Sequence, residues 1–550
     1  MTPVLKGFVD VPHGQVHFRH GGSGPPVVVL HDTPRSSLQH VPVIEWLGEH
    51  FTVIALDAPG AGNSTPLPAA RPSVEDFAAA LATTLDALGI ERCALYGLHA
   101  GACTALHFAA DHPERAALTV LDGLPSPEVP PTGELLDRRA PSFEPTDDGG
   151  YLAGVWSRIL DVHRYDPWFR RAPETRLQAA LPDDLGLHEY AIDLLTSGAS
   201  VRDAERAALG CAPGPAIARL SSPTVFLGRD DDPPLRSVDR LPQPLPTVCR
   251  LERVPHEIGA WRLRILQLLR AADLSSLQWS APVPAAAADG EQQRYVNLVH
   301  GQVRVRLRSA TGPASIPVLL LHDAPGSSAE LADLAGQLSP HRPTIAPDLP
   351  GLGESTPLPY PSLGSYVSAL SEVLDELQVP VVDIVAQGLG TSIAVALAAN
   401  RPAQVRRLAL DAVAWIRKRE RGSVRKQYCP PLEQDRHGAY LQSTWHQLRD
   451  AESSWPWFDR SPSAARVQDV ASDPSRRHAV LVDVLKQLPS YGDAARAALE
   501  AALKEILPGV RQPVLLLHDA RDTRYRGTGR ALKRLPHATQ AARPATVAGR

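Results

Sequence analysis

Short apolar runs alternate along this chain with longer stretches whose apolar positions recur every three or four residues. The runs Pro26–Leu30 and Thr52–Leu56 are almost wholly apolar, as is typical of buried parallel strands. Between such runs, Val74–Leu88 has the periodicity of a helix with one apolar face. This β–α alternation predicts a mostly parallel sheet with helices on both faces.

The whole pattern occurs twice. The sequence His-Gly-Gln-Val at 13–16 returns at 300–303, His-Asp-x-Pro at 31–34 returns at 322–325, and Asp-x-Pro-Gly at 57–60 returns at 348–351. A register this steady predicts an internal duplication of one fold. Paired or buried strands are expected in both copies, at Gln15–His20, Ala117–Leu121, Thr224–Leu227, Gln302–Leu307, Val318–Leu321, Leu408–Leu410 and Val514–Leu517.

The duplication predicts two domains joined by a linker. We expect copy one at residues 1–275, a Pro- and Ala-rich linker at 276–292, and copy two at 293–550. Each copy carries a long insert before a late core strand, at about 125–220 and about 413–510. A helix predicted over Ile258–Leu269 has no counterpart in copy two, so we expect copy two to be incomplete.

Composition narrows the class of protein. A length of 550 residues suits two domains of about 250 residues each. A net charge of −4 argues against nucleic-acid or membrane-surface binding, and the basic run at 417–426 is expected to be a solvated face. No apolar run approaches the roughly 18 residues of a membrane helix. The five cysteines lack metal-type spacing, so we expect buried thiols in a reducing compartment. No metal or nucleotide motif occurs, so we expect no cofactor. Because no hydrophobic signal region or membrane span is evident, we expect a cytoplasmic location.

Each copy also contains a strand, a sharp turn and a helix in immediate succession. In copy one the turn is Gly97-Leu98-His99-Ala100-Gly101, and its counterpart runs from Ala386 to Gly390. Small residues allow a tight turn that lifts the middle side chain out of the sheet edge. This arrangement resembles the nucleophile elbow of the α/β-hydrolase superfamily. The order of predicted strands and helices resembles the core of that superfamily over nearly the whole chain. The resemblance implies two tandem α/β-hydrolase cores, with the inserts forming helical caps.

The resemblance also suggests catalytic residues in copy one. In that superfamily the elbow residue, usually Ser and sometimes Cys or Asp, is followed along the chain by an acid and a His. The corresponding positions are His99, Asp231 and His256, with Asp122 as a reserve acid. An imidazole can act as a nucleophile or as a base, or it can fill a lost site. The chain is similar to an uncharacterised branch with Gly-x-His-x-Gly elbows.

One loop departs from the superfamily pattern. Where the superfamily normally reads His-Gly, this chain reads His31-Asp32. A carboxylate would repel a developing oxyanion unless Asp32 turned away or were protonated, although the backbone N–H of Ala100 could still donate. The departure counts against ordinary ester hydrolysis.

These observations lead to two hypotheses of different classes. In the first, copy one acts on a small carbonyl, ester or C–C substrate, by hydrolysis or lyase-like proton transfer. In the second, the protein is a non-catalytic module that binds a small molecule or a protein. Copy two is expected to be degenerate, because its elbow apex is Gly388 and its counterpart of His256 is Val547, although Asp522 remains. It would serve as a pseudo-dimer partner of copy one, or within a further homo-oligomer.

Overall fold

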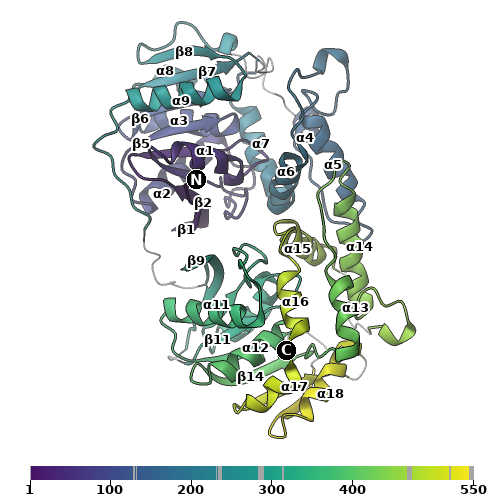
Figure 1. The fold of residues 1–550 in the computed structure, drawn as a ribbon. Helices are drawn as coiled ribbons and strands as arrows, with labels where there is room; N and C mark the ends of the chain where they lie inside the picture. The colour runs from purple at the N-terminus through teal and green to yellow at the C-terminus, as the bar shows by residue number, and fades with distance from the viewer. Residues whose placement is uncertain are drawn as a thin grey trace. The chain divides into compact units, whose positions relative to one another are not determined.

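The computed structural model describes residues 2–127, 131, 133–230, 232, 238–282, 290–312, 315–466, 473–519 and 522–543. Asp231, Val547 and residues 283–289 of the predicted linker lie outside these residues. The chain separates into two compact units (Figure 1). Unit 1 comprises residues 1–144 and 151–284, and unit 2 comprises residues 145–150 and 285–550.

The described part of unit 1 is built on an eight-stranded sheet in the order β1-β2-β4-β3-β5-β6-β7-β8. The pairings of β1 with β2 and of β2 with β4 are antiparallel, and the other pairings are parallel. The predicted strands at Pro26–Leu30 and Thr52–Leu56 are β3 and β4, and every residue of both is buried. The remaining strands are β1 (Leu5–Val11), β2 (Gly14–Gly21), β5 (Cys93–Leu98), β6 (Ala116–Asp122), β7 (Thr224–Arg229) and β8 (Cys249–Val254).

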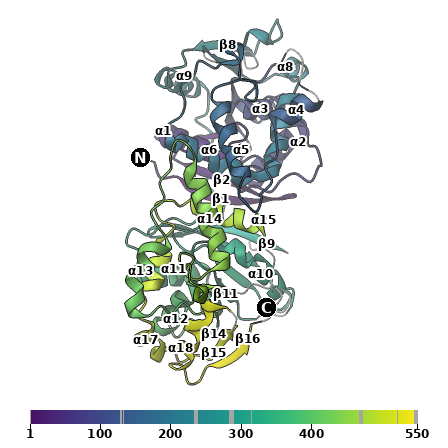
Figure 2. The ribbon, with the colours of Figure 1, turned by 90° about the vertical axis from the view of Figure 1, so that its right-hand side faces the viewer.

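Helices cover both faces of this sheet. Apolar side chains of α2 (Val74–Ala87) and α3 (Ala100–Asp111) form one hydrophobic cluster with the strands. Those of α1 (Val41–Leu47) and α9 (Ile258–Ala271) form another. The insert between β6 and β7 is helical, with α5 packed against α6 (Figure 2). Its helices are α4 (Gly133–Arg139), α5 (Tyr151–Val162), α6 (Asp184–Ser197), α7 (Val201–Gly210) and α8 (Gly214–Arg219).

Unit 2 repeats this topology, with its described strands in the order β9-β10-β12-β11-β13-β14-β15-β16. They are β9 (Glu291–Leu298), β10 (Gly301–Arg308), β11 (Val318–Leu321), β12 (Thr344–Pro347), β13 (Val382–Gln387), β14 (Val405–Asp411), β15 (Val514–His518) and β16 (Thr539–Ala542). The helices are α10 (Ala332–Leu338), α11 (Leu363–Glu376), α12 (Gly390–Asn400), α13 (Lys418–Tyr428), α14 (Ala439–Ser453), α15 (Pro474–Leu485), α16 (Asp493–Glu500), α17 (Leu503–Ile506) and α18 (Arg526–Leu532). The predicted fold, two tandem α/β-hydrolase cores, is confirmed.

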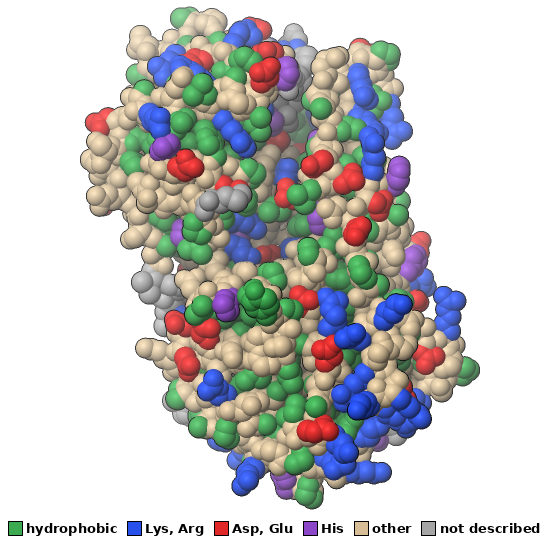
Figure 3. Space-filling model, in the orientation of Figure 1, with side chains coloured by type: hydrophobic (Ala, Val, Ile, Leu, Met, Phe, Trp, Pro, Cys, Tyr) green, Lys and Arg blue, Asp and Glu red, His purple; other side chains and the backbone are tan. Residues whose placement is uncertain are grey.

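The predicted basic run lies at the start of α13. Its exposed residues are Arg417, Lys418, Arg419, Arg425 and Lys426, so the prediction of a solvated face is confirmed. Figure 3 shows Lys and Arg side chains gathered on this part of the surface of unit 2. Within the described ranges, no helix combines the length and the apolar character needed to cross a membrane.

Candidate active site

His99 stands at the apex of a strand-to-helix turn. β5 ends at Leu98, α3 begins at Ala100, and His99 has φ 48° and ψ −105°, a backbone conformation that L side chains rarely adopt. The neighbouring glycines leave no room for a side chain, because a Cβ would lie 2.6 Å from Gly101 O at Gly97 and 2.4 Å from Leu30 O at Gly101. The predicted elbow therefore exists, and it projects an imidazole.

Both ring nitrogens of His99 have partners. Nδ1 lies 2.8 Å from Oδ2 of Asp32, and Nε2 lies 3.3 Å from a guanidinium nitrogen of Arg229. A guanidinium can only donate, so Nε2 is the acceptor and Nδ1 carries the proton that it donates to Asp32. His99 is thus held as the neutral tautomer whose Nε2 lone pair can accept a proton.

The other carboxylate oxygen of Asp32 accepts hydrogen bonds from the backbone. Oδ1 accepts from Thr33 N at 2.8 Å and from Ala100 N at 3.3 Å. The N–H of Ala100 is the donor that the sequence marked for stabilising an oxyanion. Asp32 does not turn away from this donor, as an oxyanion hole built on Ala100 would require, but accepts a hydrogen bond from it. Acyl transfer through a serine-type oxyanion hole is therefore disfavoured in copy one.

Copy two has the same carboxylate without the imidazole. Oδ1 of Asp323 accepts from Ala324 N at 2.8 Å and from Leu389 N at 2.7 Å. Gly388, at the apex, has φ 53°, and a Cβ there would lie 2.0 Å from Oδ2 of Asp323. Burial raises the pKa of Asp323, while its two backbone hydrogen bonds oppose the rise. The apex thus has neither a reactive side chain nor space for one.

A cavity of about 420 Å³ opens beside His99. Asp32, His99 and Arg229 line it from the core, while Trp168 and Tyr190 line it from the insert, which therefore acts as a cap. Tyr151 and Trp156, two further aromatic residues of the insert, are buried. Two further arginines of the lining are fixed by acids, Arg35 by Asp193 at 2.6 Å and Arg139 by Asp166 at 2.9 Å.

The remaining predicted residues occupy other places. Asp122 is fully buried and accepts hydrogen bonds from the Tyr96 hydroxyl (2.7 Å) and the Trp261 indole (2.6 Å). Its other oxygen lies 3.6 Å from Nε of Arg229. His256 is exposed, and it does not belong to the described residues that line the cavity beside His99. The structure thus brings together His99, Asp32 and Ala100, and not His256.

Sequence reasoning missed two residues that the structure adds to the site. Arg229 ends β7 at the carboxyl edge of the sheet, and Asp232 accepts its backbone N–H at 2.8 Å. Burial raises the pKa of Asp232, with the hydrogen bond and charge of Arg229 opposing the rise. Both residues lie within two positions of Asp231, in the loop at the carboxyl end of a core strand. That position in the sequence could have identified them as candidate site residues.

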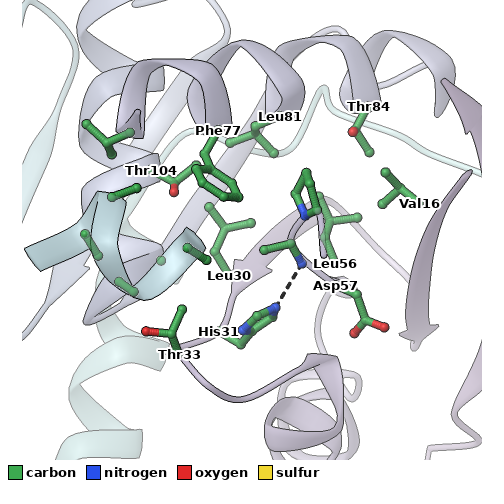
Figure 4. A pocket seen from close by; sticks show the side chains of 18 residues that line it. Val16, Leu30, His31, Thr33, Leu56, Asp57, Phe77, Leu81, Thr84 and Thr104 are labelled. Atoms are coloured by element: carbon green, nitrogen blue, oxygen red, sulfur yellow. Dashed lines mark hydrogen bonds between the residues drawn. The ribbon is translucent and has the colours of Figure 1, made fainter. Parts of the chain in front are cut away.

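A smaller cavity, of about 50 Å³, lies behind the elbow (Figure 4). Leu30, Phe77 and Leu81 make it largely apolar, and Thr33 and Ala100 line both cavities. Nε2 of His31 accepts the N–H of Ala58 at 2.9 Å, and its Nδ1 donates to the carbonyl of Asp32 at 2.7 Å. His31 therefore fixes the backbone of the loop that presents the Asp32 carboxylate.

Gly123 provides a test of how closely the His99 ring is confined. A Cβ at Gly123 would lie 2.6 Å from Cδ2 and 3.0 Å from Nε2 of His99. We expect Gly123→Ala to displace the His99 ring. It should also lower the free energy of unfolding by about 1–3 kcal/mol, because φ is positive at Gly123. Gly89→Ala is the matched control, with φ +68° and open space. Histidine NMR shifts should change only in Gly123→Ala, and unchanged shifts there would contradict the geometry.

Comparisons with known proteins agree with the fold. Residues 25–150 and 316–428 match the family model of the alpha/beta hydrolase fold. The chain is similar to a fluoroacetate dehalogenase of Burkholderia sp. (33% identity; 22% of this chain, 43% of the relative). It is also similar to a 2-hydroxy-6-oxo-6-phenylhexa-2,4-dienoate hydrolase of Comamonas testosteroni (31%; 21% and 41%). It therefore spans less than half the length of these curated relatives.

Among solved structures, the enol-lactonase from Burkholderia xenovorans LB400 resembles part of this chain. It is 16% identical, with a TM-score of 0.38, and the match covers 48% of this chain and 99% of that chain.

Proposed function

Since this chain belongs to the α/β-hydrolase superfamily as a tandem duplication, we propose that copy one is a hydrolytic enzyme with His99 as its general base. One observation carries the proposal: Asp32 holds Nδ1 of His99 at 2.8 Å, and His99 itself lines the cavity under the cap. A carboxylate that fixes the tautomer of an imidazole and stabilises its protonated form is the usual support of a histidine base.

The expected substrate is a small carbonyl compound or ester. Its oxygen would take the N–H of Arg229 that now contacts Nε2 of His99. Water would attack the carbonyl carbon while its proton passes to Nε2, and the leaving group would take that proton as the tetrahedral intermediate collapses. The oxyanion would be stabilised by Arg229, because the Thr33 and Ala100 donors are bonded to Asp32.

The relatives support hydrolysis without identifying the substrate. One of the two similar curated proteins is named as a dehalogenase and the other as a hydrolase. We propose that this chain differs from a serine-type hydrolase in forming no acyl-enzyme, because an imidazole at the apex gives no stable ester.

A second candidate function has an observation in its favour. In both copies a carboxylate accepts hydrogen bonds from the backbone N–H groups at the position of an oxyanion hole. These donors are therefore occupied, which suits a binding site without catalysis. On this view the cavity of copy one binds a small carbonyl compound without turnover. For copy two we propose a non-catalytic role in either case, because Gly388 has no side chain.

Both candidates can be tested on the full chain with one set of probes. Activated esters and β-diketones report hydrolysis, and deuterium uptake at carbons next to a carbonyl, followed by NMR in D₂O, reports proton abstraction. Turnover by the wild type and its loss in His99→Gln, with an unchanged melting temperature, are expected. If the wild type binds the probes and neither hydrolyses nor deuterates them, the proposed enzymatic function is wrong and the non-catalytic binding function is supported.

A further inference from the structure

A third cavity, of about 650 Å³, lies elsewhere in unit 1 and contains a cysteine paired with a histidine. Cys211 directly follows α7, and His107 is on α3. Both side chains are buried, and Sγ of Cys211 lies 3.4 Å from Nε2 of His107. On the other side of the ring, Nδ1 lies 3.5 Å from Oε1 of Glu75, which is in the first turn of α2. The imidazole therefore lies between a thiol and a carboxylate, with Nδ1 close to Glu75 but not hydrogen-bonded to it.

A second thiol adjoins this line. Cys103 precedes His107 by four residues on α3 and therefore shares its helix face. Its thiol is close enough to that of Cys211 to lower the pKa of Cys211. Both cysteines also contact the carbonyl of Ala208, through Sγ of Cys103 at 3.9 Å and the backbone N–H of Cys211 at 3.3 Å. The two cysteines are thus neighbours, although they are 108 positions apart in the sequence.

The surrounding charges favour a thiolate beside an imidazolium. The hydrogen bond from Cys103 lowers the pKa of Cys211, burial opposes this, and the hydrogen bond and charge of His107 lower the pKa further. Burial lowers the pKa of His107, but Cys211, Glu75 and Asp111 outweigh burial and raise it. In contrast, burial raises the pKa of Cys93, Cys249 and Cys429.

From this arrangement we propose a second chemical site, in which Cys211 is a nucleophile toward hydroperoxides and Cys103 is its resolving thiol. The Cys211 thiolate attacks an oxygen of the hydroperoxide, the O–O bond breaks, and the alkoxide or hydroxide leaves with the proton of His107. The sulfenic acid on Cys211 is then attacked by Cys103. The S–O bond breaks, water leaves with the thiol proton, and a Cys103–Cys211 disulfide forms.

This disulfide would join two elements that build the candidate active site. Cys103 lies on α3, four residues after His99, while Glu205, Ala208 and Leu209 of α7 line the cavity beside His99. Oxidation would therefore tie the cap helix α7 to the elbow helix. The chemistry of the thiols does not depend on the proposed hydrolytic function.

The nucleophile can be identified by alkylation of the full chain with iodoacetamide at pH 6, followed by peptide mass mapping. Ordinary thiols are less than about 1% thiolate at this pH, so Cys211 should react about ten times faster than Cys249. Cys249 is the internal control, because it is more exposed than Cys211. Faster labelling of Cys249 would overturn the proposal, and His107→Asn should remove the preference for Cys211.

Hydrogen peroxide tests the second step. One equivalent should yield a disulfide-linked peptide pair containing Cys103 and Cys211 in the wild type. In Cys103→Ser, the sulfenic acid should persist and be trapped by dimedone on Cys211. Oxidation spread evenly over the cysteines, or an unlinked Cys211 in the oxidised wild type, would overturn the proposal. The rate of Cys249 labelling in each variant reports whether its fold is intact.

Discussion

An Asp32→Asn variant should lose about 10³–10⁴-fold in turnover while keeping its fold. The Asn carbonyl can still accept from Thr33 and Ala100, so the loop keeps these hydrogen bonds. Its amide group, however, donates where the carboxylate accepted, and Nδ1 of His99 must then become the acceptor. The proton moves to Nε2, which can no longer act as a base. The measurement is kcat/KM on whichever probe the wild type turns over, beside the melting temperature.

The duplication supplies a matched control for this variant. Asp323 makes the same pair of backbone hydrogen bonds in copy two, but the apex there is Gly388 and no imidazole exists to be oriented. Asp323→Asn should therefore leave turnover unchanged. Equal losses in the two variants would show that the carboxylates act on structure alone, and wild-type activity in Asp32→Asn would remove Asp32 from the mechanism.

The architecture could be predicted from the sequence because its signals are local. A buried parallel strand is a short apolar run, and β3 and β4 begin and end where their runs do. The elbow was equally visible, since glycines flank His99 where a strand meets a helix. Because the pattern occurs twice, each element could be predicted from two stretches of sequence. The strand β11 was predicted at its correct residues in this way, although it is only four residues long.

The pairing inside the site could not be predicted, because it depends on distant residues. Asp32 and His99 are 67 positions apart, and the sequence marked Asp32 only as an obstacle to an oxyanion. His256 was chosen by its spacing from Asp231 in the superfamily pattern, and spacing along a chain does not determine where a side chain points. Arg229 lies in the same turn as Asp231, but nothing in the sequence shows that its guanidinium reaches His99, 130 positions away.

Copy two carries a half-buried carboxylate where copy one has an amide. Oε1 of Gln39 accepts the backbone N–H of Asp32 at 3.1 Å. The corresponding residue, at the same offset as Asp323 from Asp32, is Glu330. Its Oε1 is enclosed without a hydrogen-bond partner, and its Oε2 lies 3.8 Å from a guanidinium nitrogen of Arg476. Burial raises the pKa of Glu330 to about 8, with Arg476 opposing the rise and Asp323 and Asp483 adding to it.

This carboxyl should make the stability of unit 2 fall as the pH rises. An unfolded Glu titrates near pH 4.3, whereas folded Glu330 keeps its proton to about pH 8, so the folded state binds more protons between these values. Stability is therefore greatest below about pH 4.3 on this account and decreases up to about pH 8. Glu330→Gln, which restores the residue of copy one, should be only about 1 kcal/mol more stable than the wild type at pH 5. At pH 8.5 it should be more stable by an amount on the order of 3 kcal/mol.

Thermal melts of the full chain at pH 5, 7 and 8.5 measure this difference. The exposed Glu376, at the end of α11, supplies the control Glu376→Gln, whose melting temperature should follow the wild type at every pH. A parallel pH dependence in Glu330→Gln and the wild type would show that Glu330 is ionised in the folded state. In that case Arg476, rather than a retained proton, would compensate the carboxylate, and Arg476→Gln would be the variant whose stability falls at high pH.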